Sequence, residues 1–214
     1  MPTTDTDICI EGFQRSGNTY AVIAFQFAQP GHAQIAHHVH APGAVIAAVR
    51  LGIPVVILVR RPEDAIVSTV IRWPHITVRQ ALRAYVRFHD PLAPYRDRVV
   101  VGRFDDLIAD FDAIIDGVNR RFGTTFSRFG SSEDSVRTVL EELDRWDRNA
   151  LGQGEALERG RARPTAWRRR LKLELEGRYR APRLGGLRAR AEELYLRFAG
   201  DREPGQGPGR ARTA

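Results

Sequence analysis

The sequence predicts a doubly wound parallel α/β fold, with a single domain spanning residues 1–200 of the 214. A short apolar run, Ile8-Cys9-Ile10, enters a glycine-punctuated loop and then a helix-like segment, which is the order of a strand–loop–helix unit. A second run, residues 54–59, is apolar throughout and mostly β-branched, as in a strand buried on both faces of a parallel sheet. Strand-like and helix-like segments alternate along much of the chain, which indicates a parallel sheet flanked by helices.

The first half of the chain contains most of this alternation. After the first loop, residues 18–29 have the apolar content of a helix, and a Pro-Gly dipeptide stops it. Residues 34–39 are expected to form a short strand, and residues 42–51 a helix that ends at a glycine. Following the strand at 54–59, residues 62–72 begin with proline and two acidic residues, which favour the first turn of a helix.

The second half is predicted to be mainly helical. Its expected elements, in chain order, are a helix over residues 77–89, a strand over 99–104, and helices over 111–122, 132–149 and 187–198. Residues 152–164 are polar, basic and glycine-containing, so a loop is expected there. Residues 201–214 form a Gly/Pro/Arg tail that is predicted to be disordered.

Composition restricts the classes of protein that remain. Cys9 is the only cysteine, which excludes an internal disulfide framework and a multi-cysteine zinc site. The net charge of +7 comes from the arginine-rich C-terminal third, a weak basis for nucleic-acid binding, so no nucleic-acid partner is expected. No apolar run reaches the roughly 18 residues of a transmembrane segment, and the N-terminus does not resemble a signal peptide, so we expect a cytoplasmic protein.

The loop after the first strand has the character of a phosphate cradle. Gly12 and Gly17 fit the G-x-x-x-x-G frame of a P-loop, and Thr19 occupies the Ser/Thr position that closes it. Backbone N–H groups in such a loop point toward one place, and the helix that follows adds its positive dipole end. Asn18 replaces the usual lysine, and the loop's only cation is Arg15, which suits a phosphoanhydride shorter than a triphosphate. A glycine-rich turn that simply opens a helix is the alternative.

The run Arg15-Ser16-Gly17-Asn18-Thr19-Tyr20 resembles the 5′-phosphosulfate loop of the sulfotransferase family, which uses 3′-phosphoadenosine-5′-phosphosulfate (PAPS). The resemblance covers residues 8–122 and is looser at 159–168, and it points to a short bacterial-type member with a P-loop-type α/β fold. It implies that Arg15 and the residues from Ser16 to Thr19 hold the 5′-phosphate. It also implies that Arg15 stabilises the leaving phosphate and that Tyr20 stacks on the purine.

A second motif follows the strand at residues 54–59. The run Arg60-Arg61-Pro62-Glu63-Asp64-Ala65-Ile66-Val67-Ser68 resembles the family's Arg-Asn-Pro-x-Asp-x-x-Val-Ser pattern, which implies that Arg60 and Ser68 bind the 3′-phosphate of the nucleotide. Ligands of open α/β sheets bind beyond the carboxyl ends of the strands, so Arg60 is expected to share a crevice with the first loop. The alternative is an arginine at a strand end and a serine on a helix, without a ligand.

Two further segments match the family more weakly. The run Arg103-Phe104-Asp105-Asp106-Leu107 resembles its Arg-Tyr-Glu-Asp-Leu segment, which implies that Phe104 lies near adenine; a core phenylalanine is the alternative. Residues 159–168 resemble the Arg-Lys-Gly-x-x-Gly-Asp-Trp-Lys element that closes over the 3′-phosphate. This implies a nucleotide contact by Arg159, Arg161 or Arg163, with a solvated basic loop as the alternative.

Three of the six histidines lie in the run His37-His38-Val39-His40-Ala41-Pro42. The run resembles the family's Lys-(Thr/Ser)-His-x-Pro segment, which places His40 at the position of the catalytic base and His38 at that of the lysine. A neutral imidazole can accept the proton of an acceptor hydroxyl near neutral pH. Two alternatives stay open, namely metal ligation by His38 and His40 from one side of an extended segment, and a purely structural cluster.

Together the motifs predict a sulfotransferase that moves a sulfuryl group from PAPS to a hydroxyl or amine of a small-molecule or carbohydrate acceptor. The expected nucleotide product is adenosine 3′,5′-bisphosphate (PAP). No metal is expected, because arginines take the charge-neutralising role that magnesium has for triphosphates. A P-loop nucleotide kinase or NTPase and a noncatalytic nucleotide-binding protein remain as alternatives, and the sequence does not indicate the acceptor or the oligomeric state.

Overall fold

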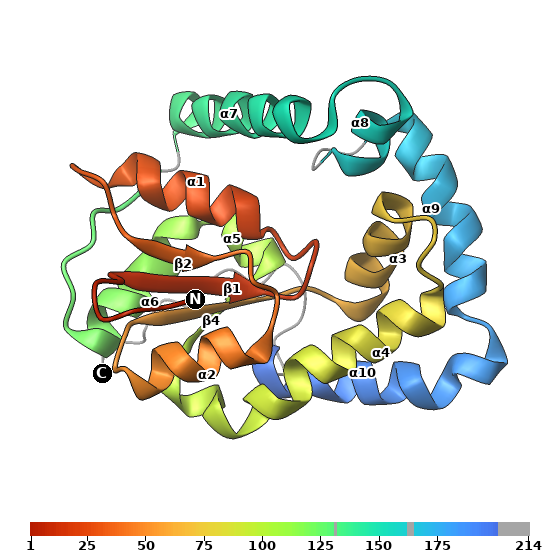
Figure 1. The fold of residues 1–214 in the computed structure, drawn as a ribbon, viewed down its shortest axis with the longest axis horizontal. Helices are drawn as coiled ribbons and strands as arrows, with labels where there is room; N and C mark the ends of the chain where they lie inside the picture. Colours follow the sequence, from red (N-terminus) through yellow and green to blue (C-terminus); the bar gives the residue numbers. More distant parts are fainter. Residues whose placement is uncertain (131, 162–164, 201–214) are drawn as a thin grey trace, which may run out of the picture.

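The computed structural model describes residues 1–130, 132–161 and 165–200 (Figure 1). These residues form a four-stranded parallel sheet with helices on both faces, in one α/β domain. The doubly wound α/β class predicted from the sequence is therefore confirmed. The tail at residues 201–214, for which disorder was predicted, lies outside the described residues. Within the described ranges, no helix is long and apolar enough to cross a membrane.

The sheet has the strand order β2-β1-β3-β4, and every neighbouring pair is parallel. The strands are β1 (Ile8–Gly12), β2 (Ile35–His37), β3 (Val55–Val59) and β4 (Val100–Arg103). Both β1 and β3 are buried along their whole length, as the apolar sequence of β3 and the apolar run at the start of β1 predict. Because β2 and β3 pair with opposite sides of β1, the strand order reverses there, and such a switch point is where open α/β sheets bind ligands.

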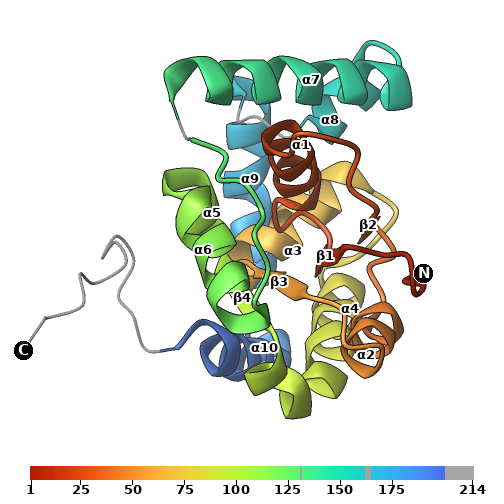
Figure 2. The same cartoon turned by 90° about the vertical axis from the view of Figure 1, so that its left-hand side faces the viewer.

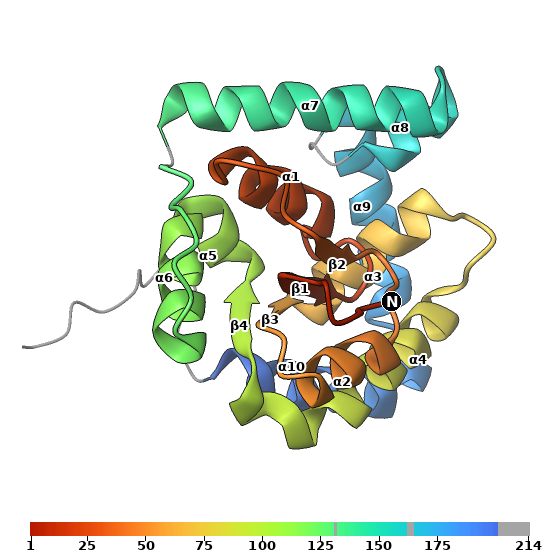
Figure 3. The ribbon, with the colours of Figure 1, turned by 60° about the vertical axis from the view of Figure 1, so that its left-hand side comes forward.

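Helices cover the two faces of the sheet (Figures 2 and 3). One face packs on α1 (Asn18–Ala28) and α6 (Phe111–Phe122), and its core includes Ile10 and Leu58. The other face packs on α2 (Pro42–Arg50), α4 (Val78–His89) and α10 (Gly185–Ala199). The remaining elements are α3 (Pro62–Arg72), α5 (Phe104–Ala109), α7 (Glu133–Leu151), α8 (Glu155–Gly160), α9 (Ala166–Tyr179) and the short 3₁₀ segments η1 (Asp90–Arg98) and η2 (Pro182–Leu184).

The sequence predicted the strands and most long helices, but not the segment that joins α7 to α10. The bounds of α3 and α6 agree with the prediction, whereas the loop predicted at residues 152–164 is wrong in part because α8 lies within it. Neither α5 nor α9 was predicted. The surface of α9 is rich in arginine, and its buried residues, Arg168, Leu175 and Tyr179, do not form a purely apolar stripe. Its helical period is therefore weak in the sequence.

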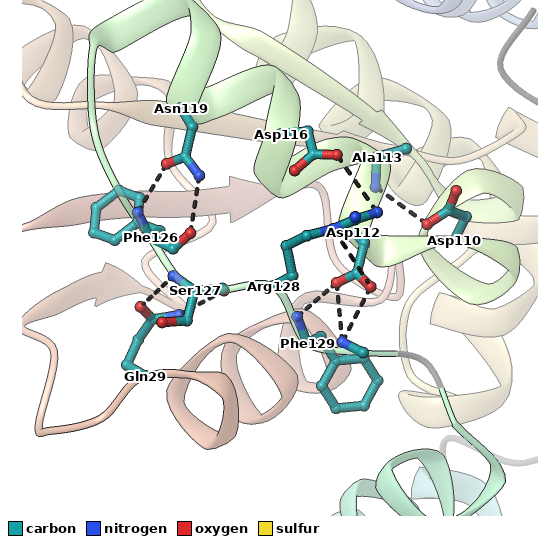
Figure 4. A network of polar contacts seen from close by, with 11 residues as sticks. Gln29, Asp110, Asp112, Ala113, Asp116, Asn119, Phe126, Ser127, Arg128 and Phe129 are labelled. Atoms are coloured by element: carbon teal, nitrogen blue, oxygen red, sulfur yellow. Dashed lines mark hydrogen bonds and ion pairs between the residues drawn. The ribbon is translucent and has the colours of Figure 1, made fainter. Parts of the chain in front are cut away.

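The connection from α6 to α7, residues 124–130, is fastened to the body of the domain by side chains (Figure 4). Buried Asp112 of α6 accepts hydrogen bonds from two N–H groups of this connection. The bonds of this network join Asp112 to the N–H groups of Phe129 and Gly130, Asn119 to both backbone groups of Phe126, and Gln29 to both backbone groups of Ser127. With its leading segment fixed in this way, α7 packs across α1 (Figure 2).

Candidate functional site

The loop between β1 and α1, residues 13–17, turns sharply at the end of the buried strand. The N–H of Ser16 donates to the carbonyl of Phe13 at 3.2 Å, and Gly17 is left-handed, with φ of 93°. A Cβ at Gly17 would lie 2.6 Å from Cδ2 of Leu107, so the position requires glycine. The first N–H groups of α1 have no intrahelical acceptor, and no side chain of the described residues caps them. This helix start can therefore bind an anion.

Polar atoms near the loop are buried without partners. Among the described residues, Ser16 Oγ, Asn18 Oδ1 and Arg60 Nε have no hydrogen-bond partner. The amide nitrogen of Asn18 is satisfied, because it donates to the carbonyl of Phe13 at 3.0 Å. Folded proteins pair nearly all buried polar atoms, with water or a ligand if not with protein. Ser16 Oγ and Arg60 Nε can donate hydrogen bonds to the oxygen atoms of a ligand, whereas Asn18 Oδ1 can only accept.

Ser68 of α3 joins two arginines that are far apart in the sequence. Its Oγ accepts from Arg15 Nε at 3.1 Å and from Arg168 Nη2 at 3.2 Å. The other two nitrogens of Arg15 donate to the carbonyls of Gly160 at 3.0 Å and Arg161 at 2.9 Å. The first loop, α3 and the α8–α9 segment are thus linked through a single guanidinium group and a single hydroxyl.

Arg60, which follows β3, contacts the backbone of the first loop. Its Nη1 donates to the carbonyl of Arg15 at 2.8 Å, and its guanidinium lies 3.9 Å from the ring centre of Phe104. The hydroxyl of Tyr85 donates to the Arg60 carbonyl at 2.9 Å and fixes the backbone there. Arg60 therefore supports the first loop while keeping one buried donor, Nε, unpaired among the described residues.

Arg15, Arg60 and Arg168 lie close enough together for their positive charges to repel one another. Burial, followed by the positive charge of Arg168, lowers the pKa of Arg15, and burial, followed by the charge of Arg60, lowers that of Arg168. Asp147 of α7 opposes both shifts. Guanidinium groups stay protonated in proteins, so the lowered pKa values express mainly the cost of removing these cations from water, with repulsion between them as a smaller cause, rather than loss of charge. A bound anion would reduce that repulsion.

The histidine segment is held to the end of β1 by Glu11. The buried carboxylate of Glu11 accepts from the N–H of Val39 at 2.6 Å and from the N–H of His40 at 3.2 Å. Nδ1 of His40 lies 2.9 Å from the carbonyl oxygen of Gly12. A carbonyl only accepts, so Nδ1 carries the hydrogen and Nε2 is the basic nitrogen of the ring.

His38 is held differently from His40. Its Nε2 lies 3.0 Å from Thr19 Oγ1, and its Nδ1 lies 2.5 Å from Nδ1 of His37. Burial, with smaller effects of His37 and His40, lowers the pKa of His38 to about 4, so the ring is neutral at pH 7. Across residues 1–130, 132–161 and 165–200, no group of three or more His, Cys, Asp or Glu side chains could hold a metal ion.

A cavity of about 720 Å³ connects these features. Its floor is the first loop with His38, His40 and Arg60, and its roof is the apolar face of α7. The ring of Trp146 in α7 lies 5.6 Å from that of His38, centre to centre. The roof residues are Leu140, Leu143, Trp146, Ala150 and Leu151. The cavity therefore has a polar side suited to anions and an apolar side suited to rings or hydrocarbon.

Most residues predicted for the site come together around this cavity. It is lined by Arg15, Gly17, Asn18, Thr19, Tyr20, His40, Arg60 and Phe104, while Ser16 and Ser68 lie behind the lining. The side chains of Arg159 and Arg161 do not line it, and they pair with Glu155 and Glu158 respectively. Arg163 falls outside the described residues.

Sequence reasoning missed several residues of this region, and four of them have clear places in its structure. Arg72 and Trp146 line the cavity, Arg168 bonds Ser68, and Glu11 holds the histidine segment. Glu11 had a visible signal, since it is a carboxylate inside an otherwise apolar strand. Arg168 lies in the run 159–168 that resembles the family's closing element, but the contact was assigned there to Arg159, Arg161 or Arg163. Its partner Ser68 lies 100 residues away in the sequence.

Comparisons with known proteins support the fold. No protein-family model and no curated protein matches the chain. Among solved structures, the chain is similar to mouse sulfotransferase SULT7A1 complexed with PAP, with a TM-score of 0.52 and 10% sequence identity over 93% of this chain and 86% of that chain. At this identity the likeness concerns the fold alone. The chain has the P-loop α/β fold of a sulfotransferase.

Proposed function

We propose that the chain is a PAPS-dependent sulfotransferase acting on a hydroxyl or amine of a small-molecule or carbohydrate acceptor. One observation carries the proposal, namely that a helix N-terminus without a side-chain cap among the described residues and a cluster of partly buried arginines meet at the same cavity. A nucleotide with phosphates on both the 5′ and 3′ positions of its ribose needs two such sites. A protein of the same fold, mouse SULT7A1, is complexed with PAP, which supports this choice of nucleotide.

Each residue of the site has a distinct task in this proposal. The N–H groups from Gly17 to Thr19 hold the 5′-phosphate, and Arg60, with Ser68 and Arg168 behind it, provides for the 3′-phosphate. Phe104 and Tyr20 flank the purine. Bound PAPS supplies the activated sulfuryl group, and Nε2 of His40 accepts the proton of the acceptor. The orphaned atoms Ser16 Oγ and Arg60 Nε are consistent with such a ligand.

Asn18 and His40 distinguish the proposed function from the alternative ones. A kinase or NTPase requires a lysine reaching the β and γ phosphates, but Asn18 occupies that position and its amide bonds the carbonyl of Phe13. A noncatalytic nucleotide-binding protein does not need a histidine with a fixed basic nitrogen beside the phosphate loop. His40 has that arrangement, so we favour the transferase.

The experiment is calorimetric titration of the full chain with PAP, ADP and ATP–magnesium. Binding of PAP at least about tenfold tighter than either other nucleotide supports the proposal, since PAP alone of the three carries a 3′-phosphate and one charge-assisted contact to it has roughly that value. Preference for ATP–magnesium would assign the chain to the kinase class. Absence of binding to all three would refute the assignment to any adenosine nucleotide.

A further inference from the structure

We propose that Glu11 is the positioning residue for His40, fixing both the place of its ring and the nitrogen that carries its hydrogen. The inference rests on the proposed function, in which His40 is the base. Glu11 lies in the central strand β1 and is fully buried. Burying a carboxylate is unfavourable unless its oxygens are paired, and the two oxygens of Glu11 are paired with the N–H groups of Val39 and His40.

The turn that Glu11 holds has an unfavourable backbone. His38 has φ of 58° and His40 has φ of 52°, in the left-handed region that residues with a side chain rarely adopt. Such conformations persist only where surrounding bonds impose them. Glu11 accepts hydrogen bonds from the N–H of His40 and from the N–H of Val39, the residue before it. These two bonds are the contacts that impose this conformation on His40.

This backbone sets the chemistry of the His40 ring. It brings Nδ1 within 2.9 Å of the Gly12 carbonyl, the residue directly after Glu11 in the same strand. Nδ1 must then be the protonated nitrogen, whereas histidine in water favours the tautomer with its hydrogen on Nε2. Glu11 Oε2 also lies 3.9 Å from Nδ1, so the carboxyl group faces the ring as well as the turn.

The test is to read the tautomer of His40 by NMR in protein labelled with ¹⁵N in its imidazole rings. The His40 signals are assigned by their loss in His40→Gln. We expect the Nδ1–H tautomer in the wild type at pH 7.5. In Glu11→Gln, one side-chain oxygen must serve two N–H groups, so we expect a mixture of both tautomers. Glu141→Gln, the same substitution at an exposed position of α7, is the matched control and should keep the wild-type spectrum.

Glu11→Ala is a second variant, in which both acceptors are lost, and it should show the mixture at least as strongly. Calorimetric titration with PAP checks that each variant keeps its nucleotide site, and we expect affinity within about threefold of the wild type. A pure Nδ1–H tautomer in folded Glu11→Gln and Glu11→Ala would overturn the inference. If instead the tautomer shifts as expected but the wild type does not bind PAP, the inference about Glu11 stands and the proposed function fails.

Discussion

Arg60→Met tests whether the cavity recognises a 3′-phosphate. The substitution removes two separable interactions of Arg60. One is the 2.8 Å bond from Nη1 to the Arg15 carbonyl, which supports the loop and so affects every adenosine nucleotide alike. The other is the unpaired Nε donor with its charge, which would matter only for a 3′-phosphate. A hydrogen bond between charged groups contributes about 1.5–3 kcal/mol, so PAP should lose about 10- to 150-fold in affinity beyond any loss shown by AMP.

The assay is calorimetric titration of PAP and AMP into the wild type, Arg60→Met and Arg61→Met. Arg61 is the matched control, because it is the next residue, is exposed and does not line the cavity. We expect the ratio of PAP to AMP affinity to fall in Arg60→Met and to change by less than about twofold in Arg61→Met. Equal losses of PAP and AMP in Arg60→Met would show that Arg60 supports the loop without contacting a 3′-phosphate.

Three further predictions concern the base, the loop and the core. His40→Ala should lower sulfuryl transfer by at least about 100-fold while PAP affinity stays within about threefold, and wild-type turnover in this variant would exclude His40 as the base. Gly17→Ala introduces a Cβ 2.6 Å from Leu107 at φ of 93°, so thermal denaturation should show a loss of about 1–3 kcal/mol that Gly31→Ala, in open space, does not show. Burial lowers the pKa of His89 from 6.5 to about 4, so the unfolded chain takes up a proton first and stability falls as the pH drops below 6.5. Between pH 7.5 and pH 5 this loss is about 2 kcal/mol, and urea unfolding of His89→Phe should lack it, whereas the exposed control His75→Phe should retain it.

The sheet was predictable because its two central strands have the apolar sequences that are typical of buried strands. The segments β1 and β3 are short and, apart from Glu11 and Gly12, apolar. A glycine-containing loop follows β1 and a proline opens the helix after β3, and those features indicate a buried parallel strand without reference to distant residues. The helix α9 lacks such a local signal. It is positioned by Arg168, whose bonds go to Ser68 and to carbonyls of α8, and such contacts exist only after the chain has folded.

The site residues also differ in how far the sequence could predict their positions. Arg60 and Ser68 lie on one strand–helix unit, so their separation in sequence already places them near each other. Arg15 was expected at the 5′-phosphate, but in the structure its guanidinium bonds Ser68 and the carbonyls of Gly160 and Arg161. A loop motif specifies where the backbone of Arg15 lies. It does not specify the direction of a side chain with four rotatable bonds, which depends on distant acceptors.

His38 limits how charge can be neutralised in the proposed reaction. The resemblance to sulfotransferases puts it at the position of a lysine, but a ring whose pKa is lowered to about 4 carries no positive charge at pH 7. The ring instead lies beside Thr19 and His37, so it can hold the Thr19 hydroxyl in place. Negative charge that develops on a leaving phosphate must then be balanced by the N–H groups of the loop and by the arginine cluster. Activity of this chain should consequently depend more strongly on Arg15 and Arg60 than it would if a lysine occupied position 38.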